Sequence, residues 1–226
     1  AEEVAQKLTT IAQEEMGLKC LDVELEAFFP YWFTGNVKNR NFGVKSWPED
    51  EAGKLKVTGY ALKASNTPAF AKGILQEALY AVGSGESEEE LHALLRPRVM
   101  EVYRGEVDVL DASSSGRISK APSAYEKSVP NPARAAIYAN EYMGTRFSKG
   151  DSVRWVYVEG VPDGNAATPV VAIQNHEAEP LDIEGYDIAW SILVEKWIGA
   201  KLKSVYKNME WDLDAVTARR VPVKMW

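Results

Sequence analysis

The chain has 226 residues, 46% of them apolar, with ten Tyr and seven Trp, which is enough for one large or two small domains with a buried core. A single Cys20 excludes an internal disulfide framework, and two His exclude a Cys/His zinc cluster, while carboxylate metal sites stay open. The net charge is -7. The lack of a long apolar run and of a charged-then-apolar leader predicts a cytoplasmic protein with no membrane partner.

The acidic total hides a pattern along the chain. Residues 36–67 and 112–156 are net positive, whereas the three blocks around and between them are net negative. Because polyanion binding depends on local potential, two basic blocks that meet in space would form a phosphate-facing surface. Ordinary variation of surface charge explains the pattern equally well.

The first 29 residues predict a helix and then a strand. Residues 1–16 carry apolar side chains at helical spacing and end at Gly17, which indicates an amphipathic helix. No capping residue precedes it, which indicates a fragment or a split-gene product, or the loss of an initiator Met. Residues 20–29 alternate as a half-buried strand does, so three carboxylates share one face, either solvated or beside a divalent cation: Asp22, Glu24 and Glu26.

An aromatic run at 28–33 is expected to be core or a lid, and a basic hairpin follows it. Residues 37–47 and 55–62 predict its two strands, with Arg40 and Phe42 on one face. Residues 65–68 (Ser-Asn-Thr-Pro) then predict a capped helix start, which could also hold a phosphate.

The second half of the chain predicts mostly helices around a small β element. A helix over 68–83 precedes another that begins at a Ser87–Glu90 capping box and is interrupted or kinked at Pro97. Residues 105–130 predict a strand and then a loop. Asn131-Pro132 then caps a helix over 133–143, on which Arg134 and Tyr138 share a face and contact either DNA or the protein's own core. Strands over 152–160 and 169–174 and a long helix over 186–209 complete the chain.

Motifs for catalysis are missing from the sequence. The Gly83–Ser87 stretch lacks the Lys of a phosphate-binding loop, and neither His92 nor His176 stands in the setting of a catalytic triad. The residues therefore favour binding over catalysis.

The order of motifs resembles the C-terminal part of a family B DNA polymerase of the archaeal or tailed-phage kind. Residues 20–26 (CLDVELE) and 39–44 (NRNFGV) are similar to an L-E-L-E strand followed by K-K-x-Y, with Arg40 at a Lys position and Phe42 at the Tyr position. Residues 59–68 are similar to the junction G-x-x-x-V-R-S-D-T-P, with Ala64 at the Arg position and Lys63 beside it. Ile118-Ser119-Lys120 with Tyr125 matches I-T-K/R followed by Tyr.

The resemblance implies an α+β fold, in which antiparallel palm-type strands and a hairpin (residues 1–64, the end of the palm) precede a mainly helical thumb with a small β element (residues 65–226). It implies that the chain grips primer–template DNA through these residues: Lys38, Arg40, Phe42, Lys63, Ser65, Asn66, Thr67, Ser119, Lys120, Tyr125, Arg134 and Tyr138.

The resemblance also implies what this chain lacks. The family's catalytic D-T-D-S motif is absent, so the chain is expected to be inactive alone and to be part of a DNA-directed DNA polymerase, a nucleotidyltransferase that uses Mg²⁺. A larger chain, or a longer parent, would carry the exonuclease, fingers and catalytic palm, and would hold the Mg²⁺, with Glu24 or Glu26 in its outer shell. A sliding clamp is a further expected partner, through residues 221–226, and the setting is an archaeal, bacterial or phage-infected cell.

Two other functions stay open at this stage. A single-stranded-DNA-binding or replication accessory protein would use the aromatic run and the hairpin as a stacking groove. A carbohydrate-binding module would explain the Trp and Tyr content but not the long helices.

Overall fold

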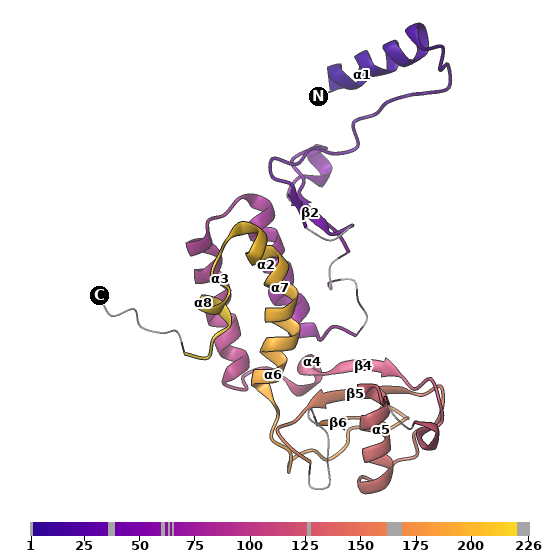
Figure 1. Ribbon diagram of the computed structural model, residues 1–226, viewed down its shortest axis with the longest axis vertical. Coiled ribbons are helices and arrows are strands. Elements are labelled where there is room, and N and C mark those ends of the chain that lie inside the picture. The colour runs from indigo at the N-terminus through magenta and orange to yellow at the C-terminus, as the bar shows by residue number, and fades with distance from the viewer. Residues whose placement is uncertain are drawn as a thin grey trace, which may run out of the picture.

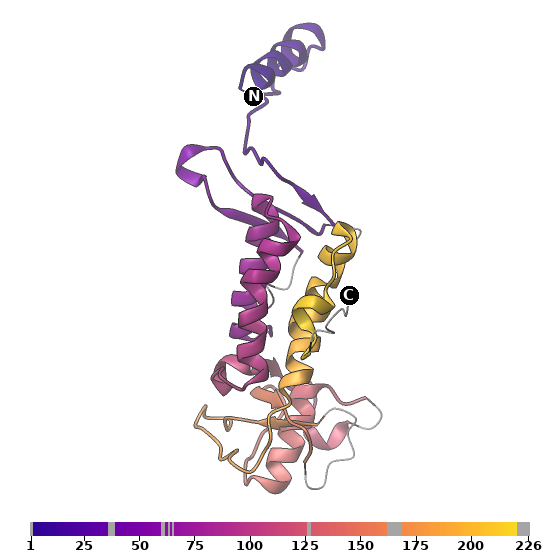
Figure 2. The same ribbon diagram turned by 90° about the vertical axis from the view of Figure 1, so that its left-hand side faces the viewer.

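The computed structural model describes residues 2–35, 39–59, 62, 64, 66–125, 128–161 and 169–220. It has the predicted α+β fold, with a helical body between two three-stranded antiparallel sheets. Figure 1 shows one sheet, here called the N-terminal sheet, at one end of the helical body and the other, the C-terminal sheet, at the opposite end, and Figure 2 shows the same order after a quarter turn. Among the described helices, none is long and apolar enough to cross a membrane.

The predicted N-terminal helix is confirmed, but its apolar face is uncovered. Helix α1 (Glu2–Thr10) runs on into the π-helical turn η1 (Ile11–Glu15), and Gly17 follows with a positive φ of 70°. The side chains of Val4, Leu8 and Ile11 are 59%, 49% and 42% exposed. This helix therefore stands apart from the main core of the described chain (Figure 1).

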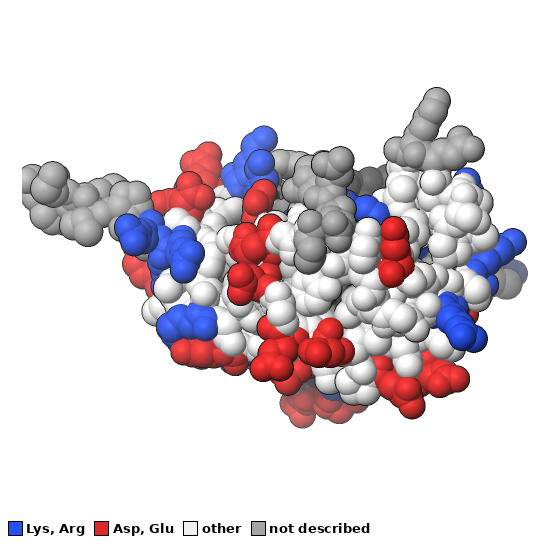
Figure 3. All heavy atoms as spheres, turned by 90° about the horizontal axis from the view of Figure 1, so that it is seen from below, with Lys and Arg blue, Asp and Glu red and all other residues white. Residues whose placement is uncertain are grey.

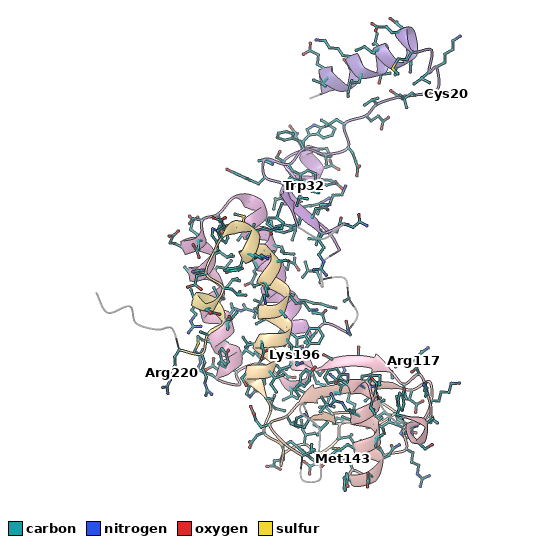
Figure 4. The ribbon with its side chains drawn as sticks, viewed as in Figure 1. Cys20, Trp32, Arg117, Met143, Lys196 and Arg220 are labelled. Atoms are coloured by element: carbon teal, nitrogen blue, oxygen red, sulfur yellow. The ribbon has the colours of Figure 1, made fainter. Side chains whose placement is uncertain are left out.

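The strand predicted over 20–29 is wrong. The alternation survives, since Val23 and Leu25 are half-buried and Glu24 is exposed, but the only pairing among described residues is a bridge between Phe28 and Trp47. A strand needs a neighbouring backbone, and here α1 supplies side chains instead: the Val23 amide donates to the Thr9 hydroxyl at 2.9 Å. The segment runs extended from α1 to the N-terminal sheet, from Cys20 to Trp32 in Figure 4.

The predicted hairpin is confirmed with shorter strands. Strands β2 (Asn41–Val44) and β3 (Leu55–Thr58) pair antiparallel, the turn η2 (Glu49–Glu51) lies in their connection, and β1 (Phe33–Thr34) extends the sheet. The expected shared face of Arg40 and Phe42 is wrong, because Phe42 is fully buried and Arg40 is exposed just before β2. Asn39 has a left-handed φ of 62°, which interrupts the alternation of a strand at this point.

A close approach of two backbones joins the N-terminal sheet to the helical body. Helix α2 (Ala69–Ser84) ends against β2, where a Cβ on Gly83 would lie 3.3 Å from the Cα of Gly43. On the other side of β2, a Cβ on Gly43 would lie 2.6 Å from the Tyr31 carbonyl oxygen, so the aromatic run crosses the strand as a lid. Side chains at these two positions would push the layers apart.

The other helices of the body largely follow the prediction. Helix α3 (Glu88–Tyr103) begins at the predicted capping box and is uninterrupted at Pro97. The last long helix consists of α6 (Trp190–Val194), the π-helical turn η5 (Glu195–Gly199) and α7 (Ala200–Met209), followed by the short α8 (Asp214–Thr217). Its predicted start at Tyr186 is too early, because Ile188 and Ala189 instead bond to the backbone of Val158 and Tyr157.

The C-terminal sheet contains three strands, and each lies within a range for which the sequence predicts a strand. The strands are β4 (Ser114–Arg117), β5 (Ser152–Tyr157) and β6 (Val170–Ala172), with the short helix α4 (Val109–Ala112) before β4 and the turn η4 (Pro122–Ala124) after it. Helix α5 (Asn131–Tyr142) packs on this sheet. Asn131 does not cap it as predicted, because the cap is Pro130 and the side-chain Nδ2 of Asn131 donates to the Tyr157 hydroxyl at 2.7 Å.

Two adjacent leucines of α3 test the packing of the helical body. Leu95 is fully buried and Leu94 is 41% exposed. We expect Leu95→Ala to lower the free energy of unfolding by about 2–5 kcal/mol, because it leaves a cavity. The matched Leu94→Ala should change it by less than about 0.5 kcal/mol. Urea unfolding followed by circular dichroism measures both, and equal losses would contradict this packing.

Candidate nucleic-acid interface

Three of the predicted DNA-binding residues meet in one turn beyond β4. The Tyr125 hydroxyl accepts a hydrogen bond from the Lys120 amide at 3.1 Å and lies 3.1 Å from the Ser119 hydroxyl. The bond with Ser119, helped by that from the Lys120 amide, lowers the pKa of Tyr125 from its ordinary value. The turn is thereby closed on itself, and the Lys120 side chain is left exposed at its surface.

Two cations outside the predicted DNA-binding set stand beside this turn. The Ile118 amide donates to the Asp151 carbonyl at 2.9 Å and the Gly150 amide to the Ile118 carbonyl at 2.8 Å, which brings Lys149 next to the turn. Arg117 ends β4 and lies at the outer end of the C-terminal sheet in Figure 4. Arg117, Lys120 and Lys149, here called the C-terminal patch, are exposed and form no ion pair with any described residue. The sequence signal that could have identified these three residues together is their position in the net-positive block 112–156.

Arg134 and Tyr138 are engaged within the protein. Arg134 donates to the side-chain oxygen of Asn131, and Asn131 in turn donates to Tyr157, whose pKa is raised by burial. The Tyr138 hydroxyl lies 2.9 Å from that of Tyr186, in the segment that precedes the last long helix. Both residues are half-buried, so this geometry supports the interpretation as packed groups of α5, and direct DNA contact by them stays a prediction.

The predicted residues of the hairpin and the helix start are split between surface and core. Arg40 and Asn66 are exposed, Thr67 is buried, and Phe42 is buried with its ring stacked on Phe33 at 4.7 Å. A ligand could reach Phe42 only if this ring pair separated. Three other predicted residues, Lys38, Lys63 and Ser65, and the 221–226 tail lie outside the described residues. The predicted cap of α2 is wrong, because Pro68 stands at the cap position and no side chain caps this end.

Lys45, Lys54 and Lys56, the other described lysines of the hairpin, form ion pairs with glutamates. Glu51 pairs with Lys45 and, at 3.7 Å, with Lys54, and Glu26 bonds to Lys56 at 2.8 Å. The hydrogen bond from Lys45 lowers the pKa of Glu51, and that from Lys56 lowers the pKa of Glu26. Part of the positive charge that the sequence assigns to this hairpin is therefore balanced by carboxylates.

The two basic blocks do not merge into one patch. The hairpin and the C-terminal patch belong to sheets at opposite ends of the helical body (Figure 1). Figure 3 shows the face beyond the C-terminal sheet, where Asp and Glu lie across the middle and along the lower edge, and Lys and Arg form separate groups on the left and on the right. Any polyanion that touches both blocks must span the helices between them.

A divalent-cation site does not fit the described residues. No group of three or more His, Cys, Asp or Glu side chains comes together among them. Glu26 is engaged by Lys56, and Glu24 is exposed without a neighbouring carboxylate cluster. These two glutamates alone offer too few oxygen ligands for Mg²⁺, which takes near-octahedral coordination.

Comparisons with known proteins confirm the resemblance. The chain is 29% identical to DNA polymerase 1 of Aeropyrum pernix over 143 residues, which are 60% of this chain and 14% of that protein. It is 23% identical to DNA polymerase 1 of Saccharolobus solfataricus over 167 residues, 70% of this chain and 18% of that protein. Its fold matches the structure of the family B DNA polymerase from Pyrobaculum calidifontis with a TM-score of 0.64 at 16% identity, over 100% of this chain and 26% of that one.

No model of a known protein family matches the chain. The chain thus has the fold of a portion of a family B DNA polymerase and spans well under a third of the proteins that it matches.

The closed turn of the C-terminal patch can be tested by amide hydrogen exchange. Tyr125→Phe removes the hydroxyl that accepts from the Lys120 amide, so we expect that amide to exchange about fivefold faster, as for the loss of roughly 1 kcal/mol. The Ile118 amide, bonded to Asp151, is the internal control and should keep its rate. An unchanged rate at Lys120, measured by NMR, would show that the Tyr125 hydroxyl does not close the turn.

Proposed function

We propose that this chain is the end of the palm (residues 1–64) and the thumb (residues 65–226) of a DNA polymerase, and that it grips the primer–template duplex during template-directed synthesis. The observation that carries the proposal is the match of the whole chain to one stretch of a family B DNA polymerase fold. The motif order and the two archaeal relatives support the same conclusion.

The length of the helical body is comparable with several base pairs of a duplex. Helix α2 has 16 residues, about 24 Å at 1.5 Å per residue, and runs between the two ends of the helical body. One strand of B-DNA advances about 3.4 Å per phosphate, so this length corresponds to roughly seven base pairs. Arg40 at one end and the C-terminal patch at the other would then hold phosphates on a single duplex. Such contacts position DNA without reading its sequence.

Further contacts come from the predicted set. Lys38, Lys63, Ser65 and Asn66 would extend the grip from the hairpin, and Ser119 and Tyr125 would hold the turn that presents Lys120. Arg134 and Tyr138 would position α5, and Phe42 would support β2 from the core.

The catalytic groups for DNA synthesis would be supplied from outside this chain. Two-metal phosphoryl transfer needs carboxylates that hold both cations, and the described residues form no such cluster. We propose that the remaining palm, with its aspartates and Mg²⁺, the fingers and the exonuclease belong to a partner chain or to a longer parent. Residues 221–226 would dock on a sliding clamp.

Single-stranded-DNA binding is the second candidate function. The exposed rings of Phe28, Tyr31 and Trp32 favour it, because bases stack on aromatic side chains. A groove for a single strand places Lys or Arg between such rings, and no Lys or Arg stands between these three in the sequence. The duplex grip is therefore the better-supported proposal.

The duplex grip predicts a charge-dependent loss of binding. The double variant Arg40→Ala/Lys120→Ala removes one cation from each end of the helical body, so we expect roughly tenfold weaker binding of a fluorescein-labelled primer–template at low salt. The slope of log Kd against log salt should fall by about one unit per lost contact. Fluorescence anisotropy over a salt series measures both quantities.

A matched control removes the same charge elsewhere. Lys203→Ala/Lys207→Ala takes two exposed cations from α7 and should leave both affinity and slope near the parent values. If the Arg40/Lys120 variant binds duplex as tightly as the parent, or if the control loses as much affinity, the assigned interface is wrong.

A further inference from the structure

A cleft of about 820 Å³ opens between the hairpin and helix α2. Its lining combines cations with apolar groups and one aromatic ring: Lys45, Lys54, Lys56, Leu55, Leu62 and Tyr80. None of these residues belongs to the predicted DNA-binding set or to the C-terminal patch. The duplex interface therefore leaves this cleft without a function.

The cleft lies away from Arg40. Strand β2 begins just after Arg40 and ends at Val44, so Lys45 and the η2 turn stand at the opposite end of the hairpin from Arg40. Lys54 and Lys56 reach the cleft from the start of β3, and Tyr80 reaches it from α2. A ligand held here would be separate from phosphates that Arg40 contacts.

The chemistry of the lining fits a single nucleic-acid strand. Proteins that bind single strands without reading sequence combine a cationic groove for the backbone with an aromatic ring on which a base stacks. The Tyr80 ring is 41% exposed beside the lysines, and the apolar side chains between them suit the faces of unpaired bases. A duplex would present only its phosphates and would leave the ring and the apolar lining unused.

Two glutamates form ion pairs with the lysines of the cleft. Glu51 lies between Lys45 and Lys54, and Glu26, whose side chain is 81% exposed, bonds to Lys56. The Lys56–Glu26 and Lys54–Glu51 pairs are open to solvent, so water and salt screen them and they contribute little, whereas the Lys45 side chain is only 13% exposed. A phosphodiester backbone can therefore displace the carboxylates, because it offers each lysine an equivalent anionic oxygen and releases counterions on binding.

We propose that this cleft is a second nucleic-acid site, which binds single-stranded DNA through Lys54, Lys56 and Tyr80, and that Glu26 and Glu51 limit its affinity by competing for the lysines. The site does not depend on the duplex grip proposed above. It would hold an unpaired strand at the η2 end of the hairpin while a duplex is held elsewhere.

The test uses the whole chain and a fluorescein-labelled oligo(dT) of about 12 nucleotides in fluorescence anisotropy, a length within the range that single binding folds cover. We expect Lys54→Ala/Lys56→Ala to weaken oligo(dT) binding roughly tenfold and to lower the salt slope by about 1.4, or 0.7 for each phosphate contact. Tyr80→Ala should weaken it about tenfold, whereas Tyr80→Phe keeps the ring and should bind like the parent.

The glutamates give a change in the opposite direction. Glu26→Gln/Glu51→Gln frees the lysines and should tighten oligo(dT) binding about threefold at low salt. Lys203→Ala/Lys207→Ala on α7 is the charge-matched control and should leave oligo(dT) binding unchanged. Thermal unfolding followed by circular dichroism confirms that each compared variant is folded.

The outcomes separate the two sites. Loss of oligo(dT) binding in the Lys54/Lys56 and Tyr80→Ala variants, with primer–template binding retained, supports the cleft. Oligo(dT) binding that survives these changes overturns the proposal, and so does an equal loss of duplex binding, which would make the cleft part of the duplex interface. Arg40→Ala/Lys120→Ala tests the duplex grip alone, so failure of either proposal is recognised without reference to the other.

Discussion

The arrangement of this protein depends on one continuous apolar core that runs through the helical body into both sheets. It includes Phe42 of β2, Ile74 of α2, Leu95 of α3 and Val156 of β5. Each sheet has three strands, most of them short, and small sheets of this kind need packing against helices to be stable. The core therefore fixes the separation of the two sheets, and with it the separation of the cations at each end.

Charge on this protein acts through its local neighbours. The hairpin and the C-terminal patch both arise from net-positive blocks, yet Lys45 and Lys56 pair with carboxylates while Lys120 is presented by a hydrogen-bonded turn with no acidic partner among the described residues. Contacts with phosphates are strong where a cation is exposed and unpaired, and weaker where a carboxylate must first be displaced. One acidic chain can thus carry two nucleic-acid sites of different strength.

Features set by local chemistry could be predicted from the sequence, and features set by distant partners could not. The Ser87–Glu90 capping box and the pairing of β2 with β3 depend on neighbouring residues and are confirmed. The prediction of a strand over 20–29 is wrong, because among the described residues no strand pairs with this segment, although its side chains alternate. The pairing of Glu26 with Lys56, 30 residues away, has no sequence signal. The Ser119–Tyr125 turn was identified by resemblance to a family, and its hydrogen bonds explain the spacing.

The central claim is that both ends of the helical body touch one duplex. Site-specific photo-crosslinking tests it most directly, with a photoreactive amino acid at position 40 in one variant and at position 120 in another, each bound to the same primer–template. The account predicts crosslinks from both positions to the paired region, at nucleotides separated by several base pairs, because the two positions lie at opposite ends of the helical body. Crosslinks from only one position, or from both to unpaired nucleotides, would contradict it.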